Sequence, residues 1–211
     1  MTTTTILIAL LLGYFFGLIH PAYIFGKVVK GIDIRKNGSN NSGASNATIV
    51  LGWKYGVLTA ALDILKGTIA ILIGRYVLNY ETSLLFIIGL GVIIAHDYPF
   101  YMGFNGGKGT ASVIGVILGI NPFIGLIMGA TIIIVTIVTD YIVYGTIAMY
   151  IVACVLTFLN YSIVGGIVIV ALTLLSIFKH RNNLRKLKEG TEFSLRQTIY
   201  KNKKDKQNIS K

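Results

Sequence analysis

Three polar clusters interrupt an otherwise apolar chain, and each contains residue types that suit the binding of an anion. The first cluster is GSNNSGASN, from Gly38 to Asn46. Glycines and small residues let backbone N–H groups converge on an anion, and the Ser and Asn side chains add further donors. A flexible linker has a similar composition, and composition alone favours that interpretation.

The second cluster is AHDYPFYMGFNGGKGTAS, from Ala95 to Ser112, and it directly precedes an apolar segment. It contains one lysine among three glycines, namely Gly106, Gly107, Lys108 and Gly109, with His96 and Pro99 upstream. Glycines allow a phosphate to approach the backbone, the helix that follows offers its N-terminal N–H groups, and the lysine supplies a positive charge. The spacing is not that of a Walker A loop, because a glycine follows the lysine where Ser or Thr would coordinate magnesium. The pattern predicts an oxyanion site.

Two charged residues lie inside an apolar segment. Asp63 and Lys66 are three residues apart, so a helix places them on one face, where they can form a pair. A charge at membrane depth is costly, and such residues usually face a polar interior and mark function. The alternative is a structural ion pair between helices, and the sequence leaves both interpretations open.

The third cluster, KHRNNLRKLKEGTE, extends from Lys179 to Glu192, where the last apolar segment ends. A basic segment in this position binds anionic lipid headgroups, which explains part of its charge. His180 and Asn183 are one helical turn apart, so both side chains can point toward one site. The cluster therefore combines a membrane-surface signal with two candidate site residues.

The composition requires that these clusters sit on membrane-spanning helices. Of the 211 residues, 54% are apolar and 13% are charged, against about 45–50% and about 25% in soluble domains, and the mean hydropathy is +0.73. Asp140 is the only formal charge between Gly109 and Phe178. Too little polar surface is available for a soluble globule, whereas a bilayer core about 30 Å thick needs about 20 apolar residues per helix. We therefore predict an all-α, polytopic membrane protein.

Simple counts exclude other classes. A single cysteine, Cys154, gives no disulfide framework and no thiolate metal cluster, so we expect neither a metal nor a cofactor. Unbroken aliphatic blocks differ from the alternating segments of a transmembrane β-barrel. The opening MTTTT lacks the basic region of a cleaved signal peptide, so the first apolar segment is expected to be a retained helix. The net charge of +11 lies mostly near the C-terminus, where it indicates topology rather than nucleic-acid binding.

The apolar blocks occur at residues 5–26, 56–78, 83–102, 110–139 and 141–178. Placing the basic stretches in the cytoplasm puts the N-terminus outside and the C-terminus inside, and it requires an even number of crossings in the last two blocks. Breaks at Asn121–Pro122, Asp140 and Asn160 favour four crossings there and about seven helices in all, although two crossings and five helices remain possible. Residues 1–195 are expected to form a single integral-membrane domain, and residues 196–211 a basic, disordered cytoplasmic tail.

Taken in order, the three clusters resemble the motifs of the bacterial membrane glycerol-3-phosphate acyltransferases that use acyl-phosphate as the donor, the PlsY family. The first family motif, roughly GSGNxGATN followed by LGxKxG and DxxKG, is similar to Gly38–Asn46, Leu51–Gly56 and Asp63–Gly67. The second, roughly GHxFPxFxxFKGGKGVAT, is similar to Ala95–Ser112, and the third, roughly HRxNIxRLxxGxE, to His180–Glu192. The joint match is specific and spans residues 1 to about 195.

The resemblance implies a seven-helix, multi-pass protein of the bacterial cell membrane with all three motifs on the cytoplasmic face. It implies that a fatty acyl group passes from acyl-phosphate to the 1-hydroxyl of glycerol 3-phosphate, giving lysophosphatidic acid and phosphate, with membrane lipid as a further partner. The implied catalytic residues are Ser39, Asn41, Lys108, His180 and Asn183. The implied substrate-binding residues are Gly38, Gly43, Asn46, Lys54, His96, Gly106, Gly107, Gly109 and Thr146, and the implied structural residues are Asp63, Lys66 and Glu192.

The sequence departs from the family pattern at positions that bind phosphate in the family. Ile49 replaces an arginine and Val143 replaces a serine, while Thr146 keeps a hydroxyl. Each lost charge-assisted contact is worth about 1.5–3 kcal/mol, so the alternative is a catalytically weak paralogue that binds a phospho-metabolite or a lipid. For an active enzyme, we expect Lys54 or Lys36 to supply part of the missing charge, as a point charge without the fork of an arginine.

Overall fold

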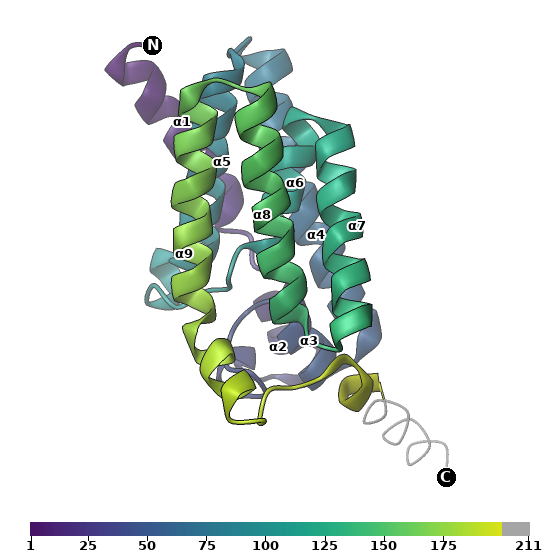
Figure 1. The fold of residues 1–211 in the computed structure, drawn as a ribbon. Coiled ribbons are helices and arrows are strands. Elements are labelled where there is room, and N and C mark those ends of the chain that lie inside the picture. Colours follow the sequence, from purple (N-terminus) through teal and green to yellow (C-terminus); the bar gives the residue numbers. More distant parts are fainter. Residues whose placement is uncertain (200–211) are drawn as a thin grey trace.

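The computed structural model describes residues 1–199, and these residues form nine α-helices, three short helical turns between them and a last helical turn at residues 195–199. The α-helices are α1 (Thr3–Gly17), α2 (Pro21–Lys30), α3 (Ala44–Leu51), α4 (Trp53–Leu72), α5 (Thr82–Asp97), α6 (Thr110–Ile120), α7 (Pro122–Thr139), α8 (Ile142–Asn160) and α9 (Ile163–Lys188). The short turns span Ile34–Lys36, Ile73–Val77 and Phe100–Met102. No strand occurs among residues 1–199, which confirms the predicted all-α class (Figure 1).

Six helical stretches in the described residues are long and apolar enough to cross a membrane. They are Thr3–Lys30, Trp53–Val77, Thr82–Met102, Pro122–Thr139, Ile142–Asn160 and Ile163–Lys188. The prediction of a polytopic helical membrane protein is therefore confirmed. α6 has 11 residues and is too short to cross alone at about 1.5 Å per residue, so a seventh crossing stays a prediction.

The last two apolar blocks contain four helices, as the breaks in the sequence predicted. α6 ends before Asn121, whose side-chain oxygen accepts two backbone N–H groups from the first turn of α7 at 3.0 and 3.2 Å. α7 ends at Asp140, which adopts the left-handed conformation with a φ of 69°. α8 ends at Asn160. Each of the two blocks is thus a pair of helices rather than one long helix.

The first apolar block, residues 5–26, lies within one candidate span, Thr3–Lys30, but it is divided into two helices, a break that the sequence analysis did not predict. α1 ends at Gly17 and α2 begins with Pro21. Proline has no N–H and cannot continue a helix across its own position, which leaves carbonyl groups of the preceding turn without partners. The Lys66 ammonium on α4 donates to two of them, the carbonyl oxygens of Ile19 (2.6 Å) and Gly17 (3.4 Å). The buried ammonium of Lys66 thus satisfies carbonyl oxygens that the break in the helix exposes.

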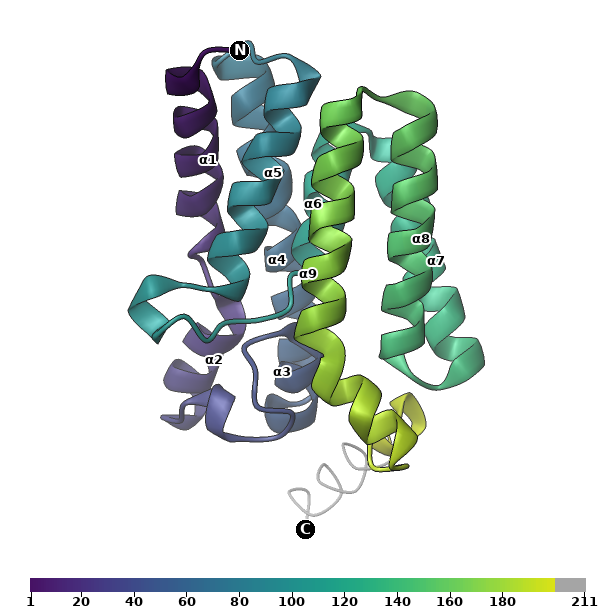
Figure 2. The ribbon, with the colours of Figure 1, turned by 60° about the vertical axis from the view of Figure 1, so that its left-hand side comes forward.

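The helices form a bundle in which α1 packs beside α5 and the α7–α8 pair forms the opposite side (Figure 2). The backbones of α1 and α5 come into direct contact at three glycines, Gly13, Gly17 and Gly91. A Cβ atom on Gly13 would lie 2.0 Å from the carbonyl oxygen of Ile88, and one on Gly91 would lie 2.4 Å from that of Leu10. Small residues allow this close approach, as they do in membrane helix bundles generally. The contact fixes the position of α5, which leads to the second motif.

Beyond α9, residues 189–199 form a strap that runs toward the turn between α7 and α8 (Figure 1). Two successive backbone N–H groups of the strap donate to Asp140, one to its carbonyl oxygen (2.8 Å) and one to its Oδ1 (2.9 Å). Ser194 caps the helical turn that follows, because its Oγ accepts a backbone N–H at 3.1 Å. Residues 196–199, the part of the predicted tail that precedes residue 200, are helical. Residues 200–211 lie outside the described residues.

Candidate active site

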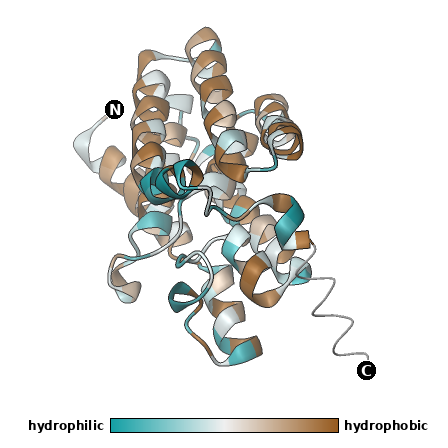
Figure 3. Cartoon of the chain, turned by 60° about the horizontal axis from the view of Figure 1, so that its bottom comes forward, coloured by the Kyte–Doolittle hydropathy of each residue, from teal (hydrophilic) through white to brown (hydrophobic). Residues whose placement is uncertain are grey.

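A cavity of about 340 Å³ opens where the lower end of α9 meets two loops. We call them the first loop, residues 37–43 before α3, and the glycine loop, residues 103–109 before α6. The lining residues are Ser39, Asn40, Asn41, Asn105, Gly106, Gly107, Lys108, Lys179, Arg181, Asn182, Asn183, Arg185 and Lys186. Five of these residues are basic and none is acidic, so the cavity attracts anions. Figure 3 shows hydrophilic ribbon gathered at this end of the bundle.

Asn46, at the start of α3, organises the first loop. Its side-chain oxygen accepts the N–H of Ser39 at 2.7 Å. Its amide nitrogen lies within hydrogen-bond distance of the carbonyl oxygens of Ile34, Asn37 and Asn41, at 2.9, 3.1 and 2.7 Å. Asn46 is completely buried and does not line the cavity. The side chain predicted to bind substrate therefore shapes the loop from beneath.

Ser39 and Asn41, which were predicted to be catalytic, both line the cavity. Asn41 Nδ2 donates to Ser39 Oγ at 2.9 Å, and Asn41 Oδ1 accepts the N–H of Gly43 at 2.9 Å. Gly38 has a φ of +63°, and a Cβ atom there would lie 2.3 Å from Oδ1 of Asn46. Gly38 and Gly43 thus give the first loop its turn and position the two polar side chains, but neither lines the cavity.

The glycine loop rests on His96. The N–H of Gly106 donates to the carbonyl oxygen of Asp97 (3.2 Å), and that of Gly107 donates to the carbonyl oxygen of His96 (3.0 Å). These two N–H groups hold the loop in place, which differs from the phosphate-binding role that the sequence suggested for them. A Cβ atom on Gly107 would lie 2.0 Å from Nε2 of His96, so glycine is needed for the loop to lie on the imidazole. Gly109, with a φ of +68°, turns the chain into α6.

Arg35 fastens the glycine loop from its outer side. Its Nη1 donates to the carbonyl oxygens of Met102 (2.5 Å) and Asn105 (3.2 Å). Its Nε and Nη2 donate to the two carboxylate oxygens of Asp33 at 2.9 and 2.7 Å. These hydrogen bonds lower the pKa of Asp33 and raise the pKa of Arg35, so both groups stay charged. The segment before the first loop is thereby tied to the glycine loop.

Lys108 and Asn183, which belong to separate motifs, meet in the cavity. The Lys108 ammonium donates to the side-chain oxygen of Asn183, and the amide nitrogen of Asn183 donates to Oε1 of Glu192 at 2.6 Å. Burial lowers the pKa of Lys108 to about 8, an effect that the negative charge of Glu192 opposes. Glu192 thus ties the strap to the cavity, and its structural role stays a prediction.

His180 lies one turn before Asn183 on α9, and it is buried beside the cavity rather than among its lining residues. Its Nδ1 lies 2.9 Å from the carbonyl oxygen of Ser176. Because a carbonyl oxygen only accepts hydrogen bonds, Nδ1 carries the proton in this contact. In the neutral imidazole the other ring nitrogen, Nε2, is then an acceptor.

Asp63 and Lys66 form the ion pair that their spacing predicted, with 2.8 Å between Oδ1 and Nζ. His96 joins this pair, because its Nδ1 lies 2.8 Å from Nζ of Lys66. The side chains are buried, with 1%, 3% and 3% of Asp63, Lys66 and His96 exposed. None of them lines the cavity, so His96, predicted to bind substrate, lies beneath the glycine loop instead.

Other residues that the sequence associated with phosphate binding lie away from the cavity lining. Lys54 and Lys36, expected to supply missing charge, are exposed, and neither lines the cavity. Thr146 is buried on α8, where its hydroxyl donates to the carbonyl oxygen of Ile142 at 3.0 Å. Ile49 is partly buried on α3 and does not line the cavity either. The positive charge of the cavity therefore comes from other residues.

Sequence reasoning missed four cations of the cavity, Lys179, Arg181, Arg185 and Lys186, all on α9. The spacing i, i+3, i+4, i+7 that marks one face of a helix is present at Lys179, Asn182, Asn183 and Lys186. The sequence therefore contained the signal that these side chains share a face. Interpreting the segment as a lipid-binding surface concealed it. Lys179 is also held in place, because its Nζ donates to the carbonyl oxygen of Asp97 at 3.0 Å.

The arrangement can hold two anionic groups side by side, because several cations offset the repulsion between them. Neutral donors are interleaved with the cations, from the amides of the first loop and of α9. Within residues 1–199, no three His, Cys, Asp or Glu side chains are grouped as ligands for a metal ion. The chemistry supported by these residues is therefore electrostatic binding and positioning of anions.

Comparisons with known proteins agree with this chemistry. The sequence profile of the family described as glycerol-3-phosphate acyltransferase matches residues 7–190. Glycerol-3-phosphate acyltransferase 1 of Oceanobacillus iheyensis is 43% identical over 196 residues, which cover 89% of this chain and 94% of that protein. The glycerol-3-phosphate acyltransferase of Thermoanaerobacter sp. is 38% identical over 188 residues, with coverage of 89% and 94%.

Two crystal structures of PlsY (YgiH), an integral membrane glycerol 3-phosphate acyltransferase, have a similar fold. The glycerol 3-phosphate form superposes with a TM-score of 0.83 at 32% identity and covers 90% of this chain and 95% of that chain. The lysophosphatidic acid form superposes with a TM-score of 0.81 at 31% identity and covers 92% and 98%. The similarity thus extends over nearly the whole bundle.

Proposed function

Because the chain belongs to the glycerol-3-phosphate acyltransferase family, we propose that it transfers a fatty acyl group from acyl-phosphate to the 1-hydroxyl of glycerol 3-phosphate. The chain is an integral membrane acyltransferase, and the products of the proposed reaction are lysophosphatidic acid and phosphate. Membrane lipid surrounds the helices and receives the lipid product.

The observation that carries this proposal is the charge of the cavity. Acyl-phosphate and glycerol 3-phosphate are both anions, so a site that brings them together must offset their mutual repulsion. The cavity of about 340 Å³ has five basic lining residues and no acidic one. A neutral acceptor or a neutral donor would not need this excess of cations.

The proposed roles follow from where the side chains lie. Lys108 binds a substrate phosphate and gives up its contact with Asn183 to do so, while Ser39 and Asn41 donate to the developing oxyanion. The amide of Asn183 and the free Nε2 of His180 position glycerol 3-phosphate. Acyl-phosphate is already activated, so positioning and electrostatic stabilisation suffice without a Ser-His-Asp triad.

The bond changes of the proposed reaction are simple. The 1-hydroxyl oxygen forms a bond to the acyl carbon, and the bond between that carbon and the phosphate oxygen breaks. The hydroxyl proton passes to a phosphate oxygen of the substrate, and no carboxylate of the cavity lining competes for it. The leaving group is inorganic phosphate, which the same cations stabilise.

We also propose that the cavity faces the cytoplasm of a bacterial cell, with the N-terminus outside. Several basic residues flank each motif, whereas residues 73–81, which connect α4 to α5 at the opposite end, carry one basic residue, Arg75, and one acidic residue, Glu81. In a Cys154→Ala background, Glu81→Cys is expected to react with an impermeant thiol reagent added to intact cells. Lys36→Cys is expected to react only after permeabilisation. Labelling of Lys36→Cys in intact cells would contradict this orientation.

The experiment that tests the activity uses purified protein in lipid nanodiscs with labelled glycerol 3-phosphate. Palmitoyl-phosphate, palmitoyl-coenzyme A and palmitoylated acyl carrier protein are supplied separately as donors, and lysophosphatidic acid is measured. We expect product with palmitoyl-phosphate only. Product formed with a thioester donor alone would contradict the proposed donor.

The same assay separates an active enzyme from the alternative, a catalytically weak paralogue that binds phospho-metabolites or lipid. The paralogue accounts for Ile49 and Val143, neither of which lines the cavity. It predicts binding of glycerol 3-phosphate without turnover, and recovery of turnover when Ile49→Arg and Val143→Ser are combined. The cations that α9 contributes favour the active enzyme, because they supply positive charge independently of residue 49.

A further inference from the structure

A buried polar cluster lies directly beneath the glycine loop and apart from the cavity lining. It consists of His20, Asp63, Lys66 and His96, whose side chains are at most 3% exposed. Four titratable residues buried at membrane depth are costly unless each has a partner. The cluster joins the end of α1, α4 and α5, so it lies where three helices meet below the site.

The contacts of Lys66 determine which nitrogen of His96 carries the proton. Its Nζ lies 2.8 Å from Oδ1 of Asp63, 2.6 Å from the carbonyl oxygen of Ile19 and 2.8 Å from Nδ1 of His96. The carbonyl oxygen of Gly17, at 3.4 Å, is a fourth partner. An ammonium group has N–H donors and no acceptor, so each atom that hydrogen-bonds to it must accept. Nδ1 of His96 is therefore an acceptor, and the ring proton of the neutral imidazole lies on Nε2.

The protonated Nε2 faces the glycine loop. It lies 2.0 Å from the position that a Cβ atom on Gly107 would occupy, and the N–H of Gly107 donates to the carbonyl oxygen of His96 at 3.0 Å. His20 stacks on His96 with ring centroids 5.0 Å apart, and its Cε1 lies 3.1 Å from the position that a Cβ atom on the preceding residue, Gly106, would occupy. Two imidazole rings thus form a floor under the loop that carries Lys108.

We propose that Lys66 is a positioning residue for the anion site, acting on Lys108 through the tautomer of His96. By donating to Nδ1 it holds the imidazole with Nε2–H directed at Gly107, which fixes the height of the glycine loop. Neither Lys66 nor His96 touches substrate. The inference rests on the proposed function for its kinetic readout, but its geometric basis is independent of the donor.

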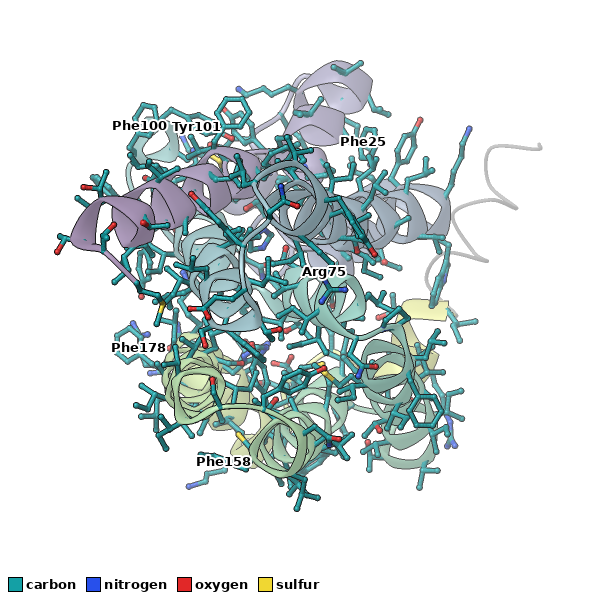
Figure 4. All side chains as sticks on the ribbon, turned by 90° about the horizontal axis from the view of Figure 1, so that it is seen from above. Phe25, Arg75, Phe100, Tyr101, Phe158 and Phe178 are labelled. Carbon is teal, nitrogen blue, oxygen red and sulfur yellow. The ribbon has the colours of Figure 1, made fainter. Side chains whose placement is uncertain are left out.

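Two substitutions of His96 distinguish this role from mere packing. The amide nitrogen of His96→Gln reaches the place of Nε2 and keeps a donor toward the loop. The amide of His96→Asn reaches only the place of Nδ1, so it keeps the contact with Lys66 and loses the donor. Lys66→Met removes the ammonium but keeps an unbranched chain. Arg75→Met is the matched control, because Arg75 (labelled in Figure 4) also donates to a backbone carbonyl, that of Ile120 (2.7 Å), and does not line the cavity.

The experiment measures kcat and KM for glycerol 3-phosphate, together with the rise in Tm that inorganic phosphate produces, for wild type and all four variants. We expect Lys66→Met and His96→Asn to lose about 10- to 100-fold in kcat/KM, since a displacement of about 1 Å in a site costs about that much. Their stabilisation by phosphate should shrink as well. His96→Gln and Arg75→Met should keep values of kcat/KM close to that of wild type.

The proposal is overturned if His96→Asn and His96→Gln lose activity equally, or if Lys66→Met lowers Tm but leaves kcat/KM and the phosphate response unchanged. The His96 pair decides the question even when Lys66→Met does not fold. A wild type without acyl transfer would contradict the proposed function instead, and the phosphate response would still test the positioning role.

Discussion

α5 and α7 are both apolar helices, yet the protein surrounds them very differently. α5 buries eleven of its 16 residues, whereas α7 buries three of its 18. α5 packs against α1, α4, α6 and α9, while α7 packs mainly against α6 and α8 and presents side chains such as Phe123 and Ile134 outward. Hydropathy alone identifies both as candidate spans and does not distinguish the central helix from the peripheral one.

The difference between the two helices lies in their small and polar residues. α5 contacts the backbone of α1 at Gly91, and it ends in His96, on which the glycine loop rests. In α7 the hydroxyls of Thr131 and Thr139 donate to carbonyl oxygens of their own helix at 2.8 and 2.7 Å. Polar groups that are satisfied within one helix leave that helix free to face lipid, whereas those of α5 build the site. Functional sensitivity should therefore follow α5 and decrease toward α7.

The largest effect is expected in the loop that follows α5. Lys108→Ala removes a charge from a buried anion site, so we expect kcat/KM to fall about 100- to 1000-fold with the protein still inserted. Lys188→Ala, at the end of α9 and outside the cavity lining, is the charge-matched control and should leave kcat/KM nearly unchanged. Equal losses in both variants would mean that overall charge, rather than the glycine loop, binds the substrate.

The pH dependence of the same loop should be the next largest effect. Lys108 binds an anion only when it is protonated, and burial lowers its pKa to about 8. The KM for glycerol 3-phosphate is therefore expected to rise about tenfold per pH unit above about pH 8 and to be flat just below it. Lys108→Arg keeps its charge in this range and should remove the rise. A KM that rises identically in wild type and Lys108→Arg would assign the titration to another group.

Substitutions in the turn that follows α7 should reduce kcat/KM less, because this turn acts on the site only through the strap. Asp140 accepts two N–H groups of the strap, whose Glu192 holds Asn183. Asp140→Ala removes one of these hydrogen bonds, worth about 1 kcal/mol, so we expect kcat/KM to fall about fivefold. Asp140→Asn keeps an acceptor oxygen and should restore most of the loss. An Asp140→Asn variant as impaired as Asp140→Ala would show that the carboxylate charge, not the hydrogen bond, is what matters.

Alanine substitutions of one glycine in α5 and one in α7 compare the packing of the two helices directly. They are expected to affect catalysis least and to change mainly the free energy of unfolding. A Cβ atom on Gly91 of α5 would lie 2.4 Å from a carbonyl oxygen of α1, whereas one on Gly129 of α7 meets nothing within 4 Å. Gly91→Ala is expected to lower the free energy of unfolding by about 1–3 kcal/mol. Gly129→Ala should raise it by up to about 1 kcal/mol, because alanine favours a helix. Thermal unfolding in nanodiscs measures both, and similar shifts would contradict the packing difference.

Helix composition and breaks were predictable because they depend on local chemistry. Asn121 caps the start of α7, and Asp140 ends α7 in a left-handed turn, both of which these residue types favour. Asn160 is the last residue of α8, and its amide donates to the carbonyl oxygen of Leu156 at 2.9 Å. The break between α1 and α2 was missed because Pro21 lies within an apolar run. The carbonyl groups that the break frees find side-chain partners far along the chain, in Lys66 and Tyr101.

The sequence predicted where a candidate site residue lies when its side chain faces the cavity or a neighbouring motif. It did not when the side chain supports the loops from beneath. Lys108, Asn183 and Glu192 were assigned from motifs, and they meet in the structure. Asn46 and His96 carry polar groups that suit substrate, yet tertiary contacts direct those groups to loop backbone and to Lys66. Spacing along the chain cannot distinguish a donor that faces a cavity from one that supports its wall.

The most direct measurement is the binding of glycerol 3-phosphate to wild type and to Lys108→Ala by isothermal titration calorimetry in nanodiscs, with glycerol as the neutral comparison. We expect wild type to bind glycerol 3-phosphate and not glycerol, and Lys108→Ala to bind at least about tenfold more weakly, because a buried charge-assisted contact is worth about 1.5–3 kcal/mol. Equal affinity of the two proteins, or binding of glycerol as tight as that of glycerol 3-phosphate, would contradict the assignment of this cavity as the anion site.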